Sequence, residues 1–161
     1  KFFEHQLLKA TSGRGIINLH HTITLYAIER VRHLFSHKEY SFMSKACLDF
    51  IGDKKIDEIT LEATKGDQLN NYTMFSETFA EMDAKLLVQS VAHMIAVPQG
   101  RLKLGRFLIK GLCDNYQGNY NPHCLTGLGS VLWIVNQYWK QPQIVVNALL
   151  QYLDFYFDDL T

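Results

Sequence analysis

The sequence predicts an all-α protein of seven or eight helices, stacked as antiparallel helical hairpins or packed as an irregular bundle. Apolar residues recur at helical spacing through most of the chain, and no run alternates apolar and polar residues over the length of a strand. All 3 prolines fall at expected helix starts or turns. With 161 residues, 47% of them hydrophobic, the chain is expected to form one domain over residues 1–161.

Two helices are expected before residue 36. Residues 1–10 carry apolar side chains on one side and charged side chains on the other, and the glycines within residues 11–15 predict a turn. Residues 16–35 then repeat apolar side chains at helical spacing, which predicts a helix of about five turns.

A third helix is expected from Ser36 to about Ile51. Ser36 and Glu39 match a capping box, in which the hydroxyl and the carboxylate each accept a hydrogen bond from a free amide at the helix start. Gly52 is a suitable helix end. The side chains that this helix is expected to bury are Phe42, Met43, Ala46, Cys47 and Phe50.

The next part of the chain is more polar. Asp53 is expected to cap a surface helix over residues 54–65. Residues 67–71 are expected to form a polar linker, and residues 73–80 to form a short helix.

Residues 85–112 are expected to form a pair of helices around which the rest of the chain is organised. The run Val97-Pro98-Gln99-Gly100 predicts a tight turn between the two helices. The pair is apolar over so much of its circumference that helices on both sides should cover it, so the core is expected along 86–112 and 128–157. Its apolar faces are predicted to contain Leu86, Leu87, Val88, Val91, Met94, Ile95, Leu104, Phe107, Leu108 and Leu112.

A further helix is expected after a polar loop. Asn121 and Pro122 predict its start, as a cap followed by a proline at the first helical position, and it should run to Trp139. Gly127 and Gly129 each cost about 1 kcal/mol relative to Ala, so a close helix crossing is expected there. The side chains that it is expected to bury are Leu125, Leu128, Leu132, Trp133 and Val135.

Pro142 opens the last predicted helix. Asp154, Asp158 and Asp159 lie near its C-terminus, where negative charge is unfavourable, so a solvated end or a basic partner is expected there. Its apolar face is predicted to contain Ile144, Val145, Leu149, Tyr152, Leu153, Tyr156 and Phe157.

The composition bears on the class of protein. Lys plus Arg and Asp plus Glu number 16 each, so no global field draws the chain to nucleic acid or membrane. No apolar run reaches the roughly 18 residues that cross a bilayer, and no membrane contact is expected. Cys47, Cys113 and Cys124 form no Cys-x-x-Cys pair, which indicates reduced thiols in an intracellular protein, cytoplasmic or nuclear. Because the chain starts at Lys1 without a signal-peptide pattern, we expect a fragment of a longer protein.

Two Pro-Gln pairs suggest a repeat. Pro98-Gln99 and Pro142-Gln143 lie 44 residues apart (from 98 to 142), within the period of roughly 40–47 residues of stacked helical hairpins. The run VLWIVNQYWKQPQIVVNALLQY, residues 131–152, resembles the hairpins of HEAT and MIF4G-type helical-repeat proteins. The resemblance covers the second half of the chain. It implies a non-enzymatic scaffold or adaptor whose helix faces bind protein or RNA.

One short motif supports a different function. Arg32 and His37 resemble the Arg-(Asn/Asp/His)-x-x-x-His motif of HEPN-type ribonucleases, with His33 after the arginine. That resemblance implies that Arg32 stabilises phosphate and that His37 is the general base of a metal-independent ribonuclease. The other interpretation is a helix end, where Arg32, His33 and His37 neutralise terminal carbonyl groups.

The histidines give no metal-ligand pattern. His20 and His21, with Glu29 or His5, contain metal-binding side chains, but adjacent histidines point to different sides of a helix. His93 and His123 are also interpreted as structural, so no metal and no cofactor are expected.

The candidate binding residues form a basic stripe, Arg101, Lys103, Arg106 and Lys110. The last three lie at i, i+3 and i+7 on one helix face, and no acidic residue occurs between Arg101 and Cys113. Such a stripe is either a solvated face or a contact surface. The expected partner is an acidic segment or helix of another protein, with a nucleic-acid backbone as the alternative.

Overall fold

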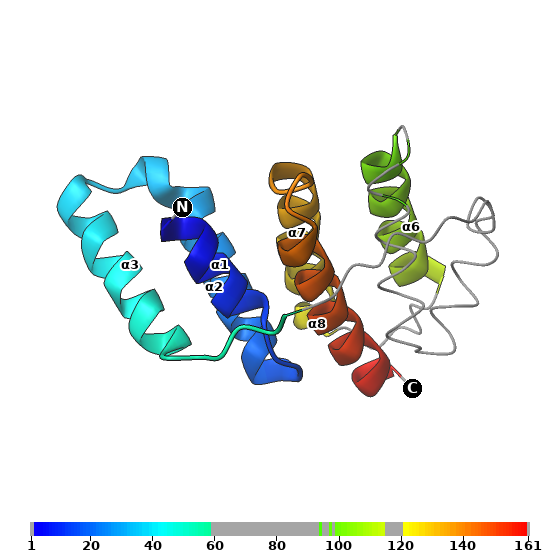
Figure 1. Ribbon diagram of the computed structural model, residues 1–161, viewed down its shortest axis with the longest axis horizontal. Helices are drawn as coiled ribbons and strands as arrows, with labels where there is room; N and C mark the ends of the chain where they lie inside the picture. The colour runs from blue at the N-terminus through cyan, green and yellow to red at the C-terminus, as the bar shows by residue number, and fades with distance from the viewer. Residues whose placement is uncertain (1, 59–93, 95–96, 98, 115–120, 161) are drawn as a thin grey trace.

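The computed structural model describes residues 2–58, 94, 97, 99–114 and 121–160, and all regular secondary structure within these residues is helical (Figure 1). The all-α prediction is therefore confirmed. The described residues form six α-helices and one short 3-10 helix, and the total of seven or eight helices stays a prediction. Within the described ranges no helix is both long and apolar enough to span a membrane.

The helix bounds agree with many of the predicted ones. They are α1 (Phe2–Thr11), α2 (Ile16–Val31), η1 (Arg32–Leu34), α3 (His37–Ile51), α6 (Gly100–Asp114), α7 (Pro122–Gln137) and α8 (Pro142–Leu160).

The helices form a row in Figure 1, with α3 at one side, then α1 and α2, then α7 and α8, and α6 at the other side. Helices α1 and α2 pack against each other and against α8. Helix α7 packs between α8 and α6. Because α3 and α6 lie at the two sides of this row, each buries only a narrow stripe of its surface.

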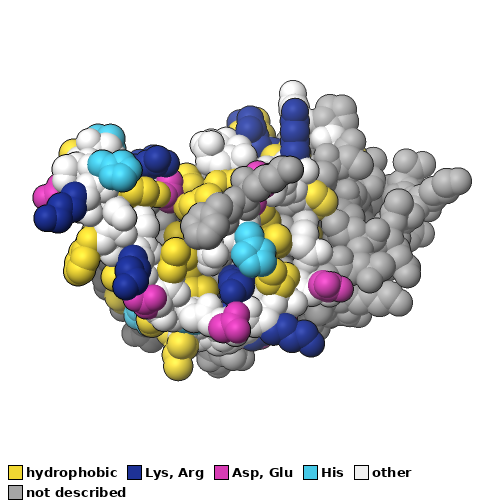
Figure 2. All heavy atoms as spheres, turned by 60° about the vertical axis from the view of Figure 1, so that its left-hand side comes forward, with side chains coloured by type: hydrophobic (Ala, Val, Ile, Leu, Met, Phe, Trp, Pro, Cys, Tyr) yellow, Lys and Arg dark blue, Asp and Glu magenta, His cyan; other side chains and the backbone are white. Residues whose placement is uncertain are grey.

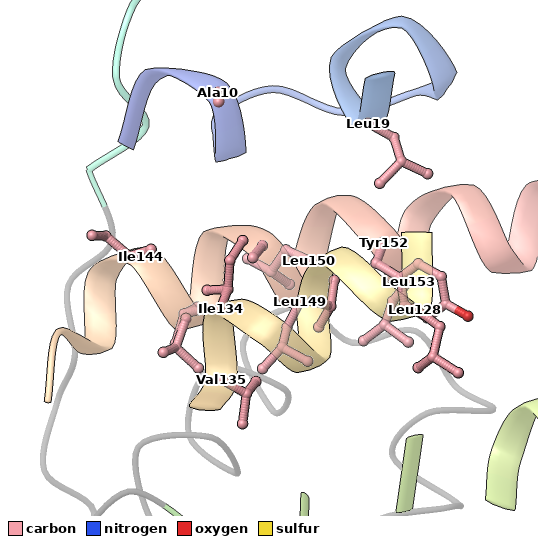
Figure 3. Packing of buried hydrophobic residues seen from close by; sticks show 14 of the residues in the cluster. Ala10, Leu19, Leu128, Ile134, Val135, Ile144, Leu149, Leu150, Tyr152 and Leu153 are labelled. Carbon is pink, nitrogen blue, oxygen red and sulfur yellow. The ribbon is translucent and has the colours of Figure 1, made fainter. Parts of the chain in front are cut away.

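The centre of the described residues is α8, so the prediction that residues 85–112 form the organising centre is not supported by this part of the chain. Every residue from Ile144 to Leu153 is buried, because α1, α2 and α7 all pack against this helix. Figure 3 shows the side chains of α8 and α7 interdigitated, with Ala10 and Leu19 above α8. The side chains predicted for the apolar face of α8 and confirmed as buried are Ile144, Val145, Leu149, Tyr152 and Leu153.

The helix of the 85–112 pair that is described, α6, buries Leu104, Phe107 and Leu108, as predicted. Its start also agrees with the predicted turn, since Gly100 N donates to Val97 O at 3.1 Å and Gln99 has φ 60°. A Cβ at Gly100 would lie 1.7 Å from the carbonyl oxygen of Met94, so only glycine fits there. The part of the predicted pair before the turn lies outside the described residues, except for Met94. This part includes His93 and Ile95, and Pro98 of the turn is also outside them.

A buried polar group joins α8 to the first two helices. The side chain of Gln151 is fully buried, and its amide nitrogen donates to the carbonyl oxygens of Ala10, Ser12 and Gly13 at 3.1, 3.3 and 3.3 Å. The Thr22 hydroxyl lies 2.6 Å from the Gln151 amide oxygen. These bonds tie the end of α1 and the turn after it to the middle of α8, and the Ala10 carbonyl oxygen also lies 3.0 Å from the Thr22 hydroxyl.

The turn between α1 and α2 is held by two carboxylates. Gly13 N donates to Asp57 Oδ2 at 2.7 Å, and Gly15 N donates to Asp154 Oδ2 at 3.0 Å. Asp154 therefore has an internal partner, which the prediction of a solvated end or a basic partner had not considered.

The segment after α3 differs from the prediction. Residues 54–58 are not helical, and Asp53 forms an ion pair with Lys9 at 3.1 Å rather than capping a helix. The main-chain oxygen of Asp57 accepts hydrogen bonds from Gln143 and Asn147 at 2.7 and 3.1 Å, which ties this segment to the first turns of α8. The rest of the predicted helix over 54–65 lies outside the described residues. The predicted linker at 67–71 and the predicted helix at 73–80 also lie outside them.

The predicted start of α7 is confirmed, since His123 N donates to the Asn121 side chain at 2.9 Å. The helix ends at Gln137 rather than Trp139. Leu125, which was expected to be buried, is 52% exposed, whereas Leu128 and Val135 are buried as predicted. The buried stripe is rotated from the predicted one because α7 touches α2, α6 and α8 on different sides, and it also contains Cys124, Val131 and Ile134.

The close crossing predicted at the α7 glycines is confirmed at Gly127. A Cβ there would lie 2.9 Å from the Tyr152 ring and 3.3 Å from Leu19. At Gly129 the nearest atom would be the Tyr26 hydroxyl oxygen at 3.6 Å, an ordinary contact.

Candidate functional site

The candidate site is the outer face of α3, which we define as Phe42, Met43, Ala46 and Phe50. The predicted capping box is confirmed, because Glu39 N donates to Ser36 Oγ and Ser36 N donates to Glu39 Oε2 at 2.8 Å. Gly52 ends the helix with φ 67°, as predicted. The predicted burial is wrong for the four residues of the outer face, since only Cys47 and Ile51 of α3 are buried.

The exposed fractions of its side chains show that this face is not part of the core. Phe42 is 72% exposed, Phe50 is 48% exposed and Met43 is 37% exposed. The physical reason is the position of α3 at the side of the row, where its main neighbours among the described helices are α1 and α2. The helical spacing of the apolar residues is real, but within the described residues no helix covers them.

A hollow of about 550 Å³ lies at the N-terminal end of the outer face. Its walls come from the end of the α2–α3 connection and from the first two turns of α3. Figure 2, which brings α3 forward, shows exposed apolar side chains interspersed with Lys and Arg side chains. The lining residues are Phe35, Ser36, Lys38, Glu39, Phe42 and Met43.

Two lysines flank the apolar part of this face. Lys38, Phe42 and Lys45 lie at i, i+4 and i+7, which places them on the same side of α3, and all three are exposed. Asp49 is exposed one turn after Lys45. Sequence reasoning overlooked Lys38 and Lys45, although their spacing from Phe42 could have identified them.

The Glu39 carboxylate is part of the cap of α3. The hydrogen bonds from the Ser36 side chain and backbone lower the pKa of Glu39, so it stays ionised at neutral pH. Its charge therefore stabilises the first turn of α3 and is aimed at Ser36 rather than at a ligand.

Arg32 and His37, the residues of the alternative ribonuclease prediction, lie on either side of the α2–α3 connection and are exposed. The Arg32 guanidinium lies 4.6 Å from the centre of the Tyr40 ring and 3.9 Å from the Glu29 carboxylate. The Tyr40 hydroxyl also bonds Glu29. Arg32 is thus held by a ring and a carboxylate. The helix-end interpretation, in which Arg32, His33 and His37 neutralise terminal carbonyl groups, stays a prediction.

The basic stripe lies on α6, at the far side of the row from α3. Arg101, Lys103, Arg106 and Lys110 are all exposed. Helical spacing places the last three on the side of α6 away from the buried Leu104 and Leu108. Arg101 Nη1 donates to the carbonyl oxygen of Asn136 at 3.3 Å, which ties that end of the stripe to α7. A contact role for the stripe stays a prediction.

Lys54 and His21 form another pair of titratable groups. Lys54 Nζ lies 3.2 Å from His21 Nδ1 and 3.4 Å from the Ala10 carbonyl oxygen. Burial lowers the pKa of Lys54 to about 8, against the opposing effect of Asp57. Burial, followed by the nearby Lys54 and His20 charges, lowers the pKa of His21. As expected for adjacent helical residues, His20 and His21 point in different directions, His21 toward Phe50 and His20 toward His123.

Comparison with known proteins gives no relative. The chain matches no protein-family model, no curated protein and no solved structure.

Proposed function

We propose that this protein is an intracellular, non-enzymatic scaffold or adaptor that binds an acidic segment or helix of another protein. In this proposal it is built of stacked antiparallel helical hairpins, as the resemblance to HEAT and MIF4G-type repeats implies. The single observation that carries the proposal is the exposed outer face of α3, Phe42, Met43, Ala46 and Phe50.

The chemistry of this face suits a partner helix. Aromatic side chains that become fully buried on binding provide much of the affinity of protein interfaces, and Phe42 and Phe50 are available for this. A partner helix binds such a face through apolar residues at i, i+3, i+4 and i+7. Lys38 and Lys45 on the same side of α3 favour carboxylates at the edges of that partner helix.

The basic stripe of α6 supports a second contact with the same acidic partner or with a nucleic-acid backbone. It lies too far along the row from α3 for one short helix to cover both surfaces. A long acidic segment, or two segments joined by a linker, would gain affinity from binding both surfaces at once.

The test begins with affinity purification of partners on the native protein and on two variants. Phe42→Ala/Phe50→Ala removes the anchors of the outer face, and Ile17→Ala/Leu125→Ala removes two similarly exposed apolar side chains on α2 and α7. Candidates retained by the native protein and the control, but lost from the α3 variant, are then purified and titrated directly. We expect the α3 variant to bind at least about tenfold more weakly, because a lost aromatic anchor costs about 1–2 kcal/mol or more.

The charged residues are tested separately. Lys38→Glu/Lys45→Glu should slow association with an acidic partner more than it speeds dissociation, and Lys103→Glu/Arg106→Glu/Lys110→Glu tests the α6 stripe. Circular dichroism first checks that helicity is unchanged. Native-strength binding of the purified partner by the Phe42→Ala/Phe50→Ala protein would reject the α3 site, and a partner without an acidic segment would reject the proposed chemistry.

A further inference from the structure

His20 of α2 and His123 of α7 lie against each other, although they are 103 residues apart in the sequence. Their Nε2 atoms are 2.8 Å apart and their ring centres are 4.8 Å apart. Both side chains are partly exposed, so solvent and ions reach the pair.

The cap of α7 determines which nitrogen of His123 carries the proton. Asn121 Oδ1 accepts from His123 N at 2.9 Å and lies 3.0 Å from His123 Nδ1. A backbone N–H only donates, so the Asn121 atom that faces it is the amide oxygen, and Nδ1 must carry a hydrogen to bond the same oxygen. The lone pair of neutral His123 is therefore on Nε2, and it points at His20.

This arrangement is the one that orients metal-binding histidines. A ligating imidazole usually donates its other ring N–H to an oxygen, which fixes both its tautomer and its orientation. Asn121 gives His123 that support, and the Phe155 ring, 6.0 Å from the ring of His123, packs against it. Burial, followed by the neighbouring His123, lowers the pKa of His20, which favours the neutral form that metals require.

We propose that His20 and His123 form a two-histidine site that binds a divalent ion of the kind that prefers imidazole, such as Zn²⁺, through their Nε2 atoms. On binding, the His20 proton moves from Nε2 to Nδ1, so the ion replaces the hydrogen bond and no proton is released. Two Zn–N bonds of about 2.0–2.1 Å at a tetrahedral angle separate the nitrogens by about 3.3 Å, which a small ring movement achieves.

The coordination is completed by water. Among the residues that the structure describes, no group of three His, Cys, Asp or Glu side chains is placed to hold a metal ion. The site is therefore expected to be weak and exchangeable compared with four-ligand zinc sites, which makes it suited to regulation. Since α2 and α7 carry one ligand each, the bound ion would link the N-terminal and C-terminal halves of the chain.

The experiment measures the Tm of the purified chain with increasing ZnCl₂, with MgCl₂ as the control for a hard cation that prefers oxygen ligands. We expect Zn²⁺ to raise Tm by roughly 3–5 °C for each tenfold increase above its Kd, and EDTA to reverse the rise. His20→Gln and His123→Gln, which keep hydrogen-bonding groups, should each abolish the rise. His33→Gln and Cys113→Ser, at exposed positions elsewhere, should keep it.

Nuclear magnetic resonance of the histidine rings provides the second readout. Zn²⁺ should convert His20 from the Nε2–H to the Nδ1–H tautomer and leave the tautomer of His123 unchanged, a signature that a structural role does not produce. No Zn²⁺-dependent rise in the native protein, or a rise that survives undiminished in either His→Gln variant, would overturn the proposal.

Discussion

The Thr22 hydroxyl lies 2.6 Å from the amide oxygen of Gln151, in the buried contact between α2 and α8. Both side chains also reach the carbonyl oxygen of Ala10, at 3.0 Å from Thr22 and 3.1 Å from Gln151. One polar contact therefore joins the end of α1, the middle of α2 and the middle of α8.

We expect Gln151→Leu to lower the free energy of unfolding by about 1–3 kcal/mol, because it removes the amide group that bonds three carbonyl groups and the Thr22 hydroxyl in this contact. Thr22→Val should also destabilise the fold, and the double variant should lose less than the sum of the two single losses, since they share partners. Urea unfolding measures all three. Gln137→Leu, at an exposed position of α7, is the matched control and should change stability by less than about 0.5 kcal/mol. Strict additivity of the two single losses would contradict the coupling.

Gly127→Ala and Gly129→Ala should have effects of opposite sign. At Gly127 the new methyl group would press on the ring of Tyr152, which is buried and whose hydroxyl donates to the Cys124 carbonyl at 3.1 Å. This overpacking should cost about 1–3 kcal/mol. At Gly129 there is room for the methyl group, so better helix propensity should stabilise the protein by up to about 1 kcal/mol. Thermal unfolding measures both, and equal shifts would show that the crossing does not depend on Gly127.

Lys54 should make stability depend on pH above neutrality. Its pKa is lowered to about 8 in the fold from its ordinary value of 10.5, so between these values the unfolded chain binds more protons than the folded chain. The stability contributed by this group is therefore lowest below pH 8 and increases as the pH rises toward 10.5. Urea unfolding at pH 8, 9 and 10 should show a smaller increase in Lys54→Met than in the native protein. The exposed neighbour Lys55→Met should behave as the native protein, and equal slopes in all three proteins would exclude this role for Lys54.

The three cysteines should differ in reactivity toward a thiol reagent at pH 8. Cys113 is exposed, whereas Cys47 and Cys124 are buried, and burial raises the pKa of Cys47 to about 11. Because the thiolate is the reactive form, the folded protein should react rapidly at Cys113 alone. Cys113→Ser should remove the rapid phase, and all three thiols should react after unfolding. Rapid labelling of Cys47 in the folded protein would mean that α3 separates from α2.

The chain should not cleave single-stranded RNA in the presence of EDTA. The Arg32 guanidinium already contacts the Glu29 carboxylate and the Tyr40 ring, so it is less available to stabilise a phosphate. Cleavage that disappears in both Arg32→Ala and His37→Ala would instead establish the alternative, a HEPN-like ribonuclease.

Several features of this protein could be predicted from sequence because they depend on nearby residues. The Ser36–Glu39 capping box, the Asn121 cap before Pro122 and the helix end at Gly52 are set by hydrogen bonds and backbone angles within a few residues. Hydrophobic spacing also predicted the buried face of α8, because other helices surround α8 and bury any apolar residue that it carries.

The same spacing failed on α3, for a physical reason. Periodicity shows that Phe42, Ala46 and Phe50 share a face, but it contains no information about whether a neighbour exists to cover that face. The tertiary arrangement placed α3 at the side of the row and left the face exposed.

The sequence by itself thus determined where most described helices begin and end and that the protein is helical, since these properties follow from local bonding and spacing. Only the tertiary structure decided that α8 is the central helix of the described residues, that Gln151 meets Thr22, and that His20 meets His123. Such contacts join residues more than 100 positions apart, and they depend on how whole helices pack rather than on any short motif.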